Sequence, residues 1–204
     1  MRIIAGTLRG RTLESPSEKT TRPTTDRVRE SMFSSIYSRL DIEGVSVLDA
    51  FAGSGALGVE ALSRGAGRVT FFEADGDAHK VLKRNLEKLK IGRGQATLVH
   101  ADVFTAAERR LPGSPFDLVL LDPPYAYPAA DVLDLMLNLQ NSGSLKPDAL
   151  IVYEYSNKNA REVTALFEAC DELQVSTQKK YGHIGVIYLR PGVKEDTVPS
   201  AEQE

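Results

Sequence analysis

The sequence predicts an α/β protein with a doubly wound, mostly parallel seven-stranded sheet, helices on both faces and an antiparallel hairpin at the edge. Two observations predict this fold. From about residue 44, short apolar runs typical of buried strands alternate with segments of helical periodicity. Near the end of this region, only the turn YGHIG at 181–185 separates two strand-like runs. Because such a turn is too short for a crossover helix, these two strands are expected to pair antiparallel.

Seven segments have the apolar character of strands. They are residues 45–50, 69–73, 96–101, 116–121, 150–155, 173–180 and 186–189. The clearest helix between them is predicted over Asp75–Lys90, where apolar residues three or four apart form one face and charged residues fill the other. This alternation assigns residues 44–190 to one domain.

Residues 1–43 are expected to form an N-terminal extension that precedes the sheet domain in the sequence. The run RIIAGTLRGRTL mixes β-branched residues with glycines, which is typical of a small hairpin. The spacing of apolar residues predicts a helix over 24–40, with Thr24 or Thr25 as its N-cap. Arg27 and Arg29 lie off the apolar stripe of this helix, so we expect them to be accessible to an external anion.

Charge is distributed unevenly over the 204 residues. Residues 1–30 carry a net charge of +3 and the remainder −6. Because a phosphate backbone responds to local potential, the extension is a candidate nucleic-acid surface, although a merely solvated arginine-rich face is the alternative. The candidate contacts are Arg9, Arg11, Arg22, Arg27 and Arg29.

The remaining bulk features point to an ordinary cytoplasmic protein. A single cysteine excludes an internal disulfide, no apolar run approaches the roughly 20 residues of a membrane span, and the start of the chain lacks a secretory signal. We expect a cytoplasmic monomer with no membrane partner. The polar, acidic stretch at 191–204 is predicted to be disordered.

A glycine-rich segment follows the first predicted strand, in the run VLDAFAGSGALGVEAL. Gly53, Gly55 and Gly58 have the spacing G-x-G-x-x-G, which allows a tight turn against a ligand but also occurs in dinucleotide-binding proteins. Asp49 precedes the glycines, and its carboxylate would repel a pyrophosphate while suiting the ammonium group of S-adenosylmethionine. We therefore predict that this loop, including Phe51, binds S-adenosylmethionine.

Two further acids end the next two predicted strands. Glu73 ends the second, where a carboxylate can accept hydrogen bonds from both ribose hydroxyls, and Asp102 ends the third, where it can accept from an adenine amino group. Either acid alone could be an ordinary exposed acid. Because ligands of open α/β sheets bind along the carboxyl ends of the strands, the acids together predict a site for a nucleoside-bearing cofactor.

The fourth predicted strand leads into Asp122-Pro123-Pro124-Tyr125. The exocyclic amine of a base is a poor nucleophile because its lone pair is delocalised into the ring. Hydrogen bonds to the Asp122 carboxylate and the Pro123 carbonyl would favour a tetrahedral nitrogen and aim its lone pair for in-line displacement. Tyr125 can stack on an unstacked base. We predict Asp122, Pro123 and Tyr125 as catalytic residues; a merely proline-stiffened loop is the alternative.

These segments together resemble the 16S rRNA (guanine-N2)-methyltransferase family of bacteria. The likeness extends to about residue 190. It is carried by RIIAG near the start, TRPTTDRVRESMF at 21–33, LDAFAGSGALGVEALSRGA at 48–66 and DLVLLDPPY at 117–125. The block at 21–33 is the most specific, because glycine loops and the tetrad occur in many amino-methyltransferases. The sequence departs from the family at Ala50, where a larger apolar residue is usual, and in the turn that carries His183.

The resemblance implies a class I methyltransferase fold, which is Rossmann-like, and methyl transfer from S-adenosylmethionine to the N2 of a guanine in small-subunit ribosomal RNA. It implies that the extension helps to hold RNA, within a small-subunit particle. The implied cofactor contacts are Asp49, Gly53, Gly55, Glu73, Asp102 and Asp122. No metal is expected, since no His/Cys/Asp cluster has metal-ligand spacing.

Two other functions fit parts of the sequence. Methylation of adenine N6 or cytosine N4, on DNA or RNA, uses the same tetrad; the block at 21–33 and the short chain argue against it, since DNA enzymes usually add a longer target-recognition region. A non-catalytic RNA chaperone in ribosome assembly is the other alternative. The complete set of acids and the tetrad argue against a chaperone.

Overall fold

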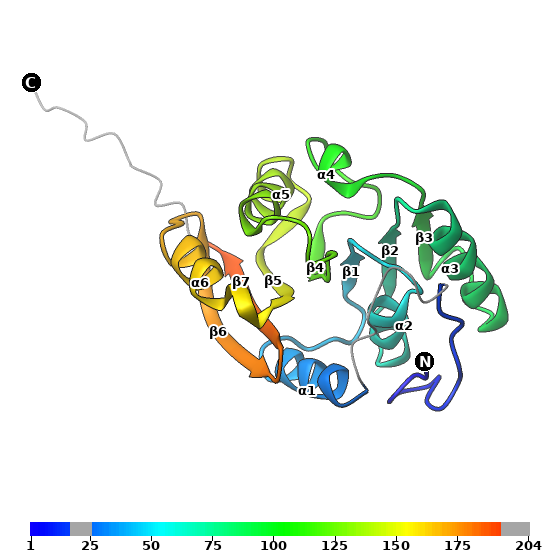
Figure 1. The fold of residues 1–204 in the computed structure, drawn as a ribbon. Coiled ribbons are helices and arrows are strands. Elements are labelled where there is room, and N and C mark those ends of the chain that lie inside the picture. Colours follow the sequence, from blue (N-terminus) through cyan, green and yellow to red (C-terminus); the bar gives the residue numbers. More distant parts are fainter. Residues whose placement is uncertain (17–25, 193–204) are drawn as a thin grey trace, which may run out of the picture.

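The computed structural model describes residues 1–16 and 26–192 and contains the predicted sheet (Figure 1). The seven strands lie in the order β3-β2-β1-β4-β5-β7-β6. They are β1 (Ser46–Asp49), β2 (Arg68–Phe72), β3 (Ala96–Val99), β4 (Phe116–Leu121), β5 (Leu145–Ser156), β6 (Leu173–Tyr181) and β7 (Ile184–Pro191). The neighbours among β1 to β5 pair in parallel, whereas β7 pairs antiparallel with both β5 and β6. The predicted fold class and edge hairpin are confirmed.

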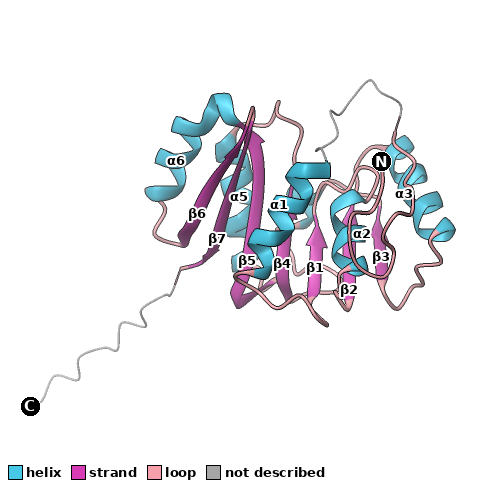
Figure 2. Ribbon diagram, turned by 90° about the horizontal axis from the view of Figure 1, so that it is seen from below, coloured by secondary structure: helices cyan, strands magenta, loops and turns pink. Residues whose placement is uncertain are grey.

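Helices cover both faces of the sheet (Figure 2). They are α1 (Asp26–Tyr37), α2 (Ala56–Ser63), α3 (Gly76–Lys88), α4 (Val103–Ala106), α5 (Ala129–Asn141) and α6 (Ala160–Glu168), with a 3₁₀ turn at Asn157–Asn159. The alternation of side chains along β4 shows the two layers. Leu118 and Leu120 pack in the core under α1, α2 and α3, and Val119 and Leu121 pack in the core under α5 and α6.

The N-terminal extension is joined to the core of the sheet domain. Its predicted hairpin is confirmed in a minimal form, with one antiparallel bridge between Arg2 and Thr12. Ile3 and Leu13 are buried in the same apolar core as α1, α2 and α3. The buried Glu60 carboxylate on α2 accepts hydrogen bonds from the backbone N–H groups of residues 4 and 5, at 2.8 and 3.1 Å. The predicted threonine N-cap of α1 lies outside the described residues.

The order of the strands reverses between β1 and β4, because β2 and β3 lie on one side of this pair and β5, β7 and β6 on the other. In doubly wound sheets, the carboxyl ends of the strands at such a switch point border the ligand-binding crevice. The glycine loop follows β1 and the tetrad follows β4. The topology therefore brings both predicted motifs to one place.

In the described ranges, 1–16 and 26–192, no helix is both long and apolar enough to cross a membrane.

Candidate active site

A pocket of about 220 Å³ opens at the carboxyl ends of β1 to β4. This volume is far above the roughly 10–15 Å³ that a single water molecule requires, so the pocket accommodates a small molecule and is not a packing defect. It is lined by Pro16, Ala50, Phe51, Gly53, Phe72, Glu73, Ala74, Asp75, Ala78, Ala101, Asp102, Val103, Asp122, Pro124 and Tyr127. Five of the predicted site residues are in this wall.

The glycines of the loop after β1 have different roles. Gly53 has a φ of +54°, and a Cβ there would meet no atom within 4 Å, which leaves its backbone open to the pocket. Gly55 has a φ of +83°, and a Cβ there would lie 2.4 Å from Leu82 on α3. Gly53 thus faces the predicted ligand, whereas Gly55 allows the turn into α2 and its close packing on α3.

Asp49 holds the loop in place. Its carboxylate is buried and accepts a hydrogen bond of 2.8 Å from the N–H of Gly58 in α2. Burial raises the pKa of this carboxyl to about 7; the Gly58 hydrogen bond opposes the rise, and the nearby Asp122 and Glu73 carboxylates add to it. Asp49 is absent from the pocket wall. Its observed contact is with the backbone of the loop, and a contact with the cofactor ammonium stays a prediction.

The raised pKa of Asp49 predicts a pH-dependent stability. The carboxyl titrates near pH 4 in the unfolded chain and near 7 in the folded one, so its contribution to stability is present at acid pH and is lost as pH rises toward 7. We expect the Tm of the ligand-free protein, relative to that of Asp49→Asn, to fall between pH 5 and pH 8. Parallel Tm curves for the two proteins over this range, measured calorimetrically, would contradict the assignment.

Glu73 and Asp102 both line the pocket, and their contacts with a cofactor stay a prediction. Glu73 follows β2, and its two oxygens accept hydrogen bonds of 2.7 Å from the N–H groups of Gly53 and Asp75. Asp102 caps α4 by accepting from the N–H of Phe104 at 2.9 Å, and its side chain is exposed. Both carboxylates therefore fix loop backbone at the pocket. Because each carboxylate oxygen has two lone pairs, both can also accept from a ligand.

The tetrad forms a turn between β4 and α5. Asp122 and Pro124 line the pocket, Pro123 is buried, and the N–H of Tyr127 donates to the carbonyl of Pro124 at 3.0 Å. Tyr125 points elsewhere: its ring is 45% exposed, and its hydroxyl donates to a Glu154 oxygen at 3.2 Å. The structure thus places Asp122 against the pocket and Tyr125 toward Glu154 near the end of β5.

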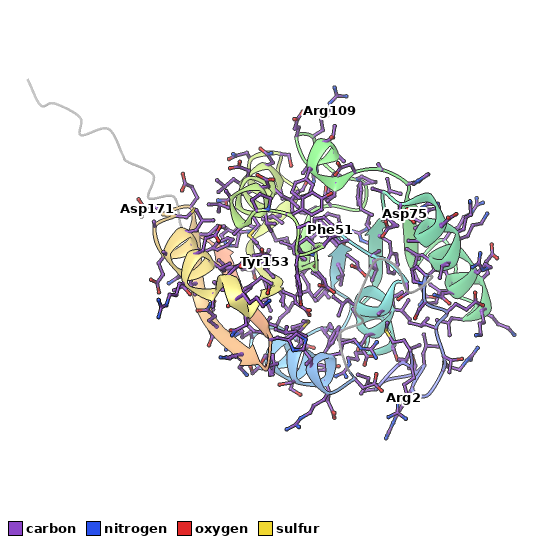
Figure 3. The ribbon with its side chains drawn as sticks, viewed as in Figure 1. Arg2, Phe51, Asp75, Arg109, Tyr153 and Asp171 are labelled. Carbon is purple, nitrogen blue, oxygen red and sulfur yellow. The ribbon has the colours of Figure 1, made fainter. Side chains whose placement is uncertain are left out.

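Sequence reasoning missed an aromatic cluster beside the pocket. The Tyr127 ring lies 4.9 Å from that of Phe104 and 6.2 Å from that of Phe51, measured between centroids. Phe51, labelled in Figure 3, lies in the middle of the molecule. A detectable signal was present: Phe51 and Phe104 each follow a site acid by two residues, and Tyr127 follows the tetrad by two. Glu154, also missed, is an acid inside the apolar run LIVYEY.

The prediction that Arg29 is accessible to RNA is wrong. Arg29 is fully buried, and its guanidinium donates to the Asp26 carboxylate and to the Arg2 carbonyl, both at 2.7 Å. Helical spacing alone placed Arg29 off the apolar stripe, but the N-terminal hairpin packs over that face. Arg29 therefore ties the hairpin to α1 and is not part of an RNA-binding surface.

The other candidate arginines differ from Arg29. Arg9, Arg11 and Arg27 are exposed, and Arg11 donates to the carbonyl of Lys88 at 3.2 Å. Arg22 lies outside the described residues. The exposed arginines remain available for the predicted contact with phosphates.

The chemistry of the pocket fits S-adenosylmethionine, which combines a sulfonium and an ammonium with an adenosine. Glu73, Asp102 and Asp122 give the wall negative charge, which complements a cation. Apolar walls at Ala78, Ala101 and Val103 suit a flat purine. Within the described part of the chain, no group of three or more His, Cys, Asp or Glu side chains is placed to hold a metal ion.

The strand order, the glycine loop and the tetrad together define a class I methyltransferase, with its Rossmann-like fold. The family model described as "Conserved hypothetical protein 95" matches residues 1–190, and the chain belongs to this family.

Individual relatives agree with this assignment. The chain is 41% identical over 154 residues to "Ribosomal RNA small subunit methyltransferase D" of Haemophilus influenzae, covering 76% of this chain and 78% of the relative. It is 37% identical over 199 residues to "Putative rRNA methyltransferase YlbH" of Bacillus subtilis, covering 94% and 100%. The solved structure titled "Putative methyltransferase yhhF from Escherichia coli" superposes with a TM-score of 0.78 at 32% identity, covering 95% of this chain and 99% of that one.

Proposed function

We propose that this protein transfers a methyl group from S-adenosylmethionine to the exocyclic N2 of a guanine in small-subunit ribosomal RNA. One observation carries the proposal: Asp122, which begins a D-P-P-Y turn, lines the same acid-lined pocket as Gly53 of the glycine loop. An acceptor for a base amine thus borders the space that suits a methyl donor. The relatives named above as methyltransferases of ribosomal RNA support the substrate class.

In this proposal, Glu73 accepts hydrogen bonds from the ribose hydroxyls and Asp102 accepts from the adenine amine. Both carboxylates are already oriented by backbone N–H groups, so binding requires little ordering of these side chains. The backbone of Gly53, where a Cβ would meet no atom within 4 Å, lies against the amino-acid end of the cofactor. When bound, the cofactor supplies a methyl group on a positively charged sulfur.

Asp122 and Pro123 act on the amine. The Asp122 carboxylate and the Pro123 carbonyl accept its two N–H hydrogens, which favours a tetrahedral nitrogen and aims the lone pair at the methyl carbon. The methylated nitrogen then loses a proton, to Asp122 or to water. Tyr125, with its partly exposed ring, packs on the face of a base that has left its stack.

A direct assay tests this function. The protein is incubated with S-adenosylmethionine labelled in its methyl group and small-subunit particles from cells that lack the family enzyme, and the RNA is digested and analysed by mass spectrometry. Label in N2-methylguanine is the expected result. Label in N6-methyladenine or N4-methylcytosine would show that the target is not guanine N2. Absence of label from the RNA would overturn the proposal that the protein methylates ribosomal RNA.

The exposed arginines of the extension are proposed to contact RNA phosphates. We expect the triple variant Arg9→Ala, Arg11→Ala, Arg27→Ala to bind RNA more weakly. The magnitude of the slope of log K against log salt concentration should fall by about 1 to 2, because binding with fewer phosphate contacts releases fewer counterions. Filter binding at several salt concentrations measures this slope.

A matched variant distinguishes a local site from a change in overall charge. Arg93, Arg109 and Arg110 are also exposed, so their triple alanine variant removes the same formal charge elsewhere on the molecule. An equal loss of slope in both variants would show that the extension has no special part in RNA binding.

A further inference from the structure

Glu154 is a buried acid at the carboxyl end of β5, outside the cofactor pocket. It is 3% exposed, and one of its oxygens accepts the hydrogen bond from the Tyr125 hydroxyl. Placing a carboxylate among apolar residues is costly unless its oxygens are hydrogen-bonded. Its neighbours Val152 and Leu150, on the same side of β5, are core residues. A buried acid beside core residues and next to the tetrad is therefore a candidate functional group.

The sheet register places Glu154 beside Asp122. Leu121, the last residue of β4, pairs with Tyr153 on β5, so Asp122 and Glu154 each follow this pair by one residue. Such chains lie about 4.8 Å apart. The tyrosine of the tetrad bridges the two, since Tyr125 follows Asp122 in the turn and bonds to Glu154. Two acids thus follow paired residues of neighbouring strands, next to the place proposed for the target base, and Tyr125 contacts one of them.

We propose that Glu154 selects guanine by accepting the hydrogen bond of its ring N1–H, while Asp122 holds the adjacent N2 amine. This inference rests on the proposed function and identifies a specificity residue for the same site. The N1–H and the N2 amine are neighbouring donors on one edge of guanine, which is the pattern that two adjacent carboxylates can accept. The Tyr125 hydroxyl orients the Glu154 carboxylate for this contact.

The same pair of carboxylates disfavours the other amino-bearing bases. In adenine, the ring nitrogen next to the N6 amine is an acceptor, and in cytosine the ring nitrogen next to the N4 amine is also an acceptor. Either base would place a lone pair against the Glu154 carboxylate, which repels it, and would lack the hydrogen bond that the N1–H of guanine donates. A site built to accept a hydrogen bond rejects analogues that lack the donor. Glu154 thereby distinguishes targets that the tetrad alone treats alike.

The test compares guanine with 2-aminopurine, which keeps the N2 amine but has an acceptor at N1. Small-subunit RNA is assembled with a synthetic fragment that carries either base at the nucleotide mapped as the methylation site, and kcat/KM is measured for both. We expect the wild-type protein to prefer guanine at least about tenfold. Glu154→Gln, which is nearly isosteric and brings N–H donors, is expected to lower activity on guanine and to reduce the preference at least about fivefold.

Tyr125→Phe is the matched variant. It removes the hydroxyl from Glu154 but keeps both the carboxylate and the ring, so it is expected to retain more of the guanine preference than Glu154→Gln does. S-adenosylmethionine affinity and circular dichroism report whether each variant is folded. If Glu154→Gln is folded but inactive on both RNAs, its guanine preference is measured instead as the ratio of its affinities for the two RNAs in a competition binding experiment.

The outcomes separate this inference from the proposed function. Wild-type protein that methylates N2 of guanine and 2-aminopurine equally well would overturn the role of Glu154 and leave the function standing. An unchanged preference in Glu154→Gln, with activity lost equally on both RNAs, would make Glu154 a residue that only supports Tyr125. Label mapped to a base other than guanine would overturn the proposed function itself.

Discussion

Replacement of Asp122 by asparagine is expected to lower kcat for methyl transfer by about 10²- to 10³-fold, the scale of losing one preorganised charge-stabilising group. The asparagine keeps the size of the side chain but loses the negative charge that holds the amine and that balances charge developing on the nitrogen. Because Asp122 is one of several acids in the pocket wall, S-adenosylmethionine should still bind, with a weaker affinity. Single-turnover kinetics and calorimetric binding measure the two quantities separately.

Asp134→Asn is a suitable control, because Asp134 is an exposed acid on α5, the helix that follows the tetrad. It removes the same charge without touching the pocket, and its kcat should match that of the wild-type protein. Near-wild-type kcat in Asp122→Asn would overturn the catalytic assignment.

The second large effect is expected at Arg29. Arg29→Ala removes a buried guanidinium that bonds to Asp26 and to the carbonyl of Arg2, and it leaves a cavity between α1 and the hairpin. We expect the free energy of unfolding to fall by about 2–3 kcal/mol and Tm by about 5–10 °C. Differential scanning calorimetry measures both.

Arg27→Ala is the matched variant, two residues away on the same helix but exposed. Its Tm should stay within about 2 °C of wild type, since surface changes cost little stability, while its affinity for RNA falls. A normal Tm with weakened RNA binding in Arg29→Ala would instead restore Arg29 to the RNA-binding surface.

Much of the fold was predictable, because strand and helix periodicities are local properties. The run FDLVLL forms β4 with its predicted bounds, and the turn at 181–185 joins two antiparallel strands as expected. The largest difference is in β5, which begins at Leu145, five residues before its predicted start. Pro147 and Asp148 are residues that strands usually lack, so the sequence pattern did not indicate a strand there. In the structure, Leu145 pairs with Phe116, and the register of β4 and β5 shifts between Phe116 and Leu118.

The site was predictable where a residue ends a parallel strand, because such ends converge. Glu73, Asp102 and Asp122 line one pocket for this reason. What could not be predicted depends on packing between distant segments. The burial of Arg29 follows from the N-terminal hairpin, and the pairing of Tyr125 with Glu154 follows from the order of β4 and β5 in the sheet.

A crystal structure of the protein with bound S-adenosylmethionine tests the central claim most directly. The claim predicts the adenine beside Asp102, the ribose at Glu73 and the sulfonium methyl directed at a space bordered by Asp122 and the Pro123 carbonyl, wide enough for a base. A ligand bound elsewhere, or a methyl group turned away from Asp122 with no room for a base between them, would contradict it.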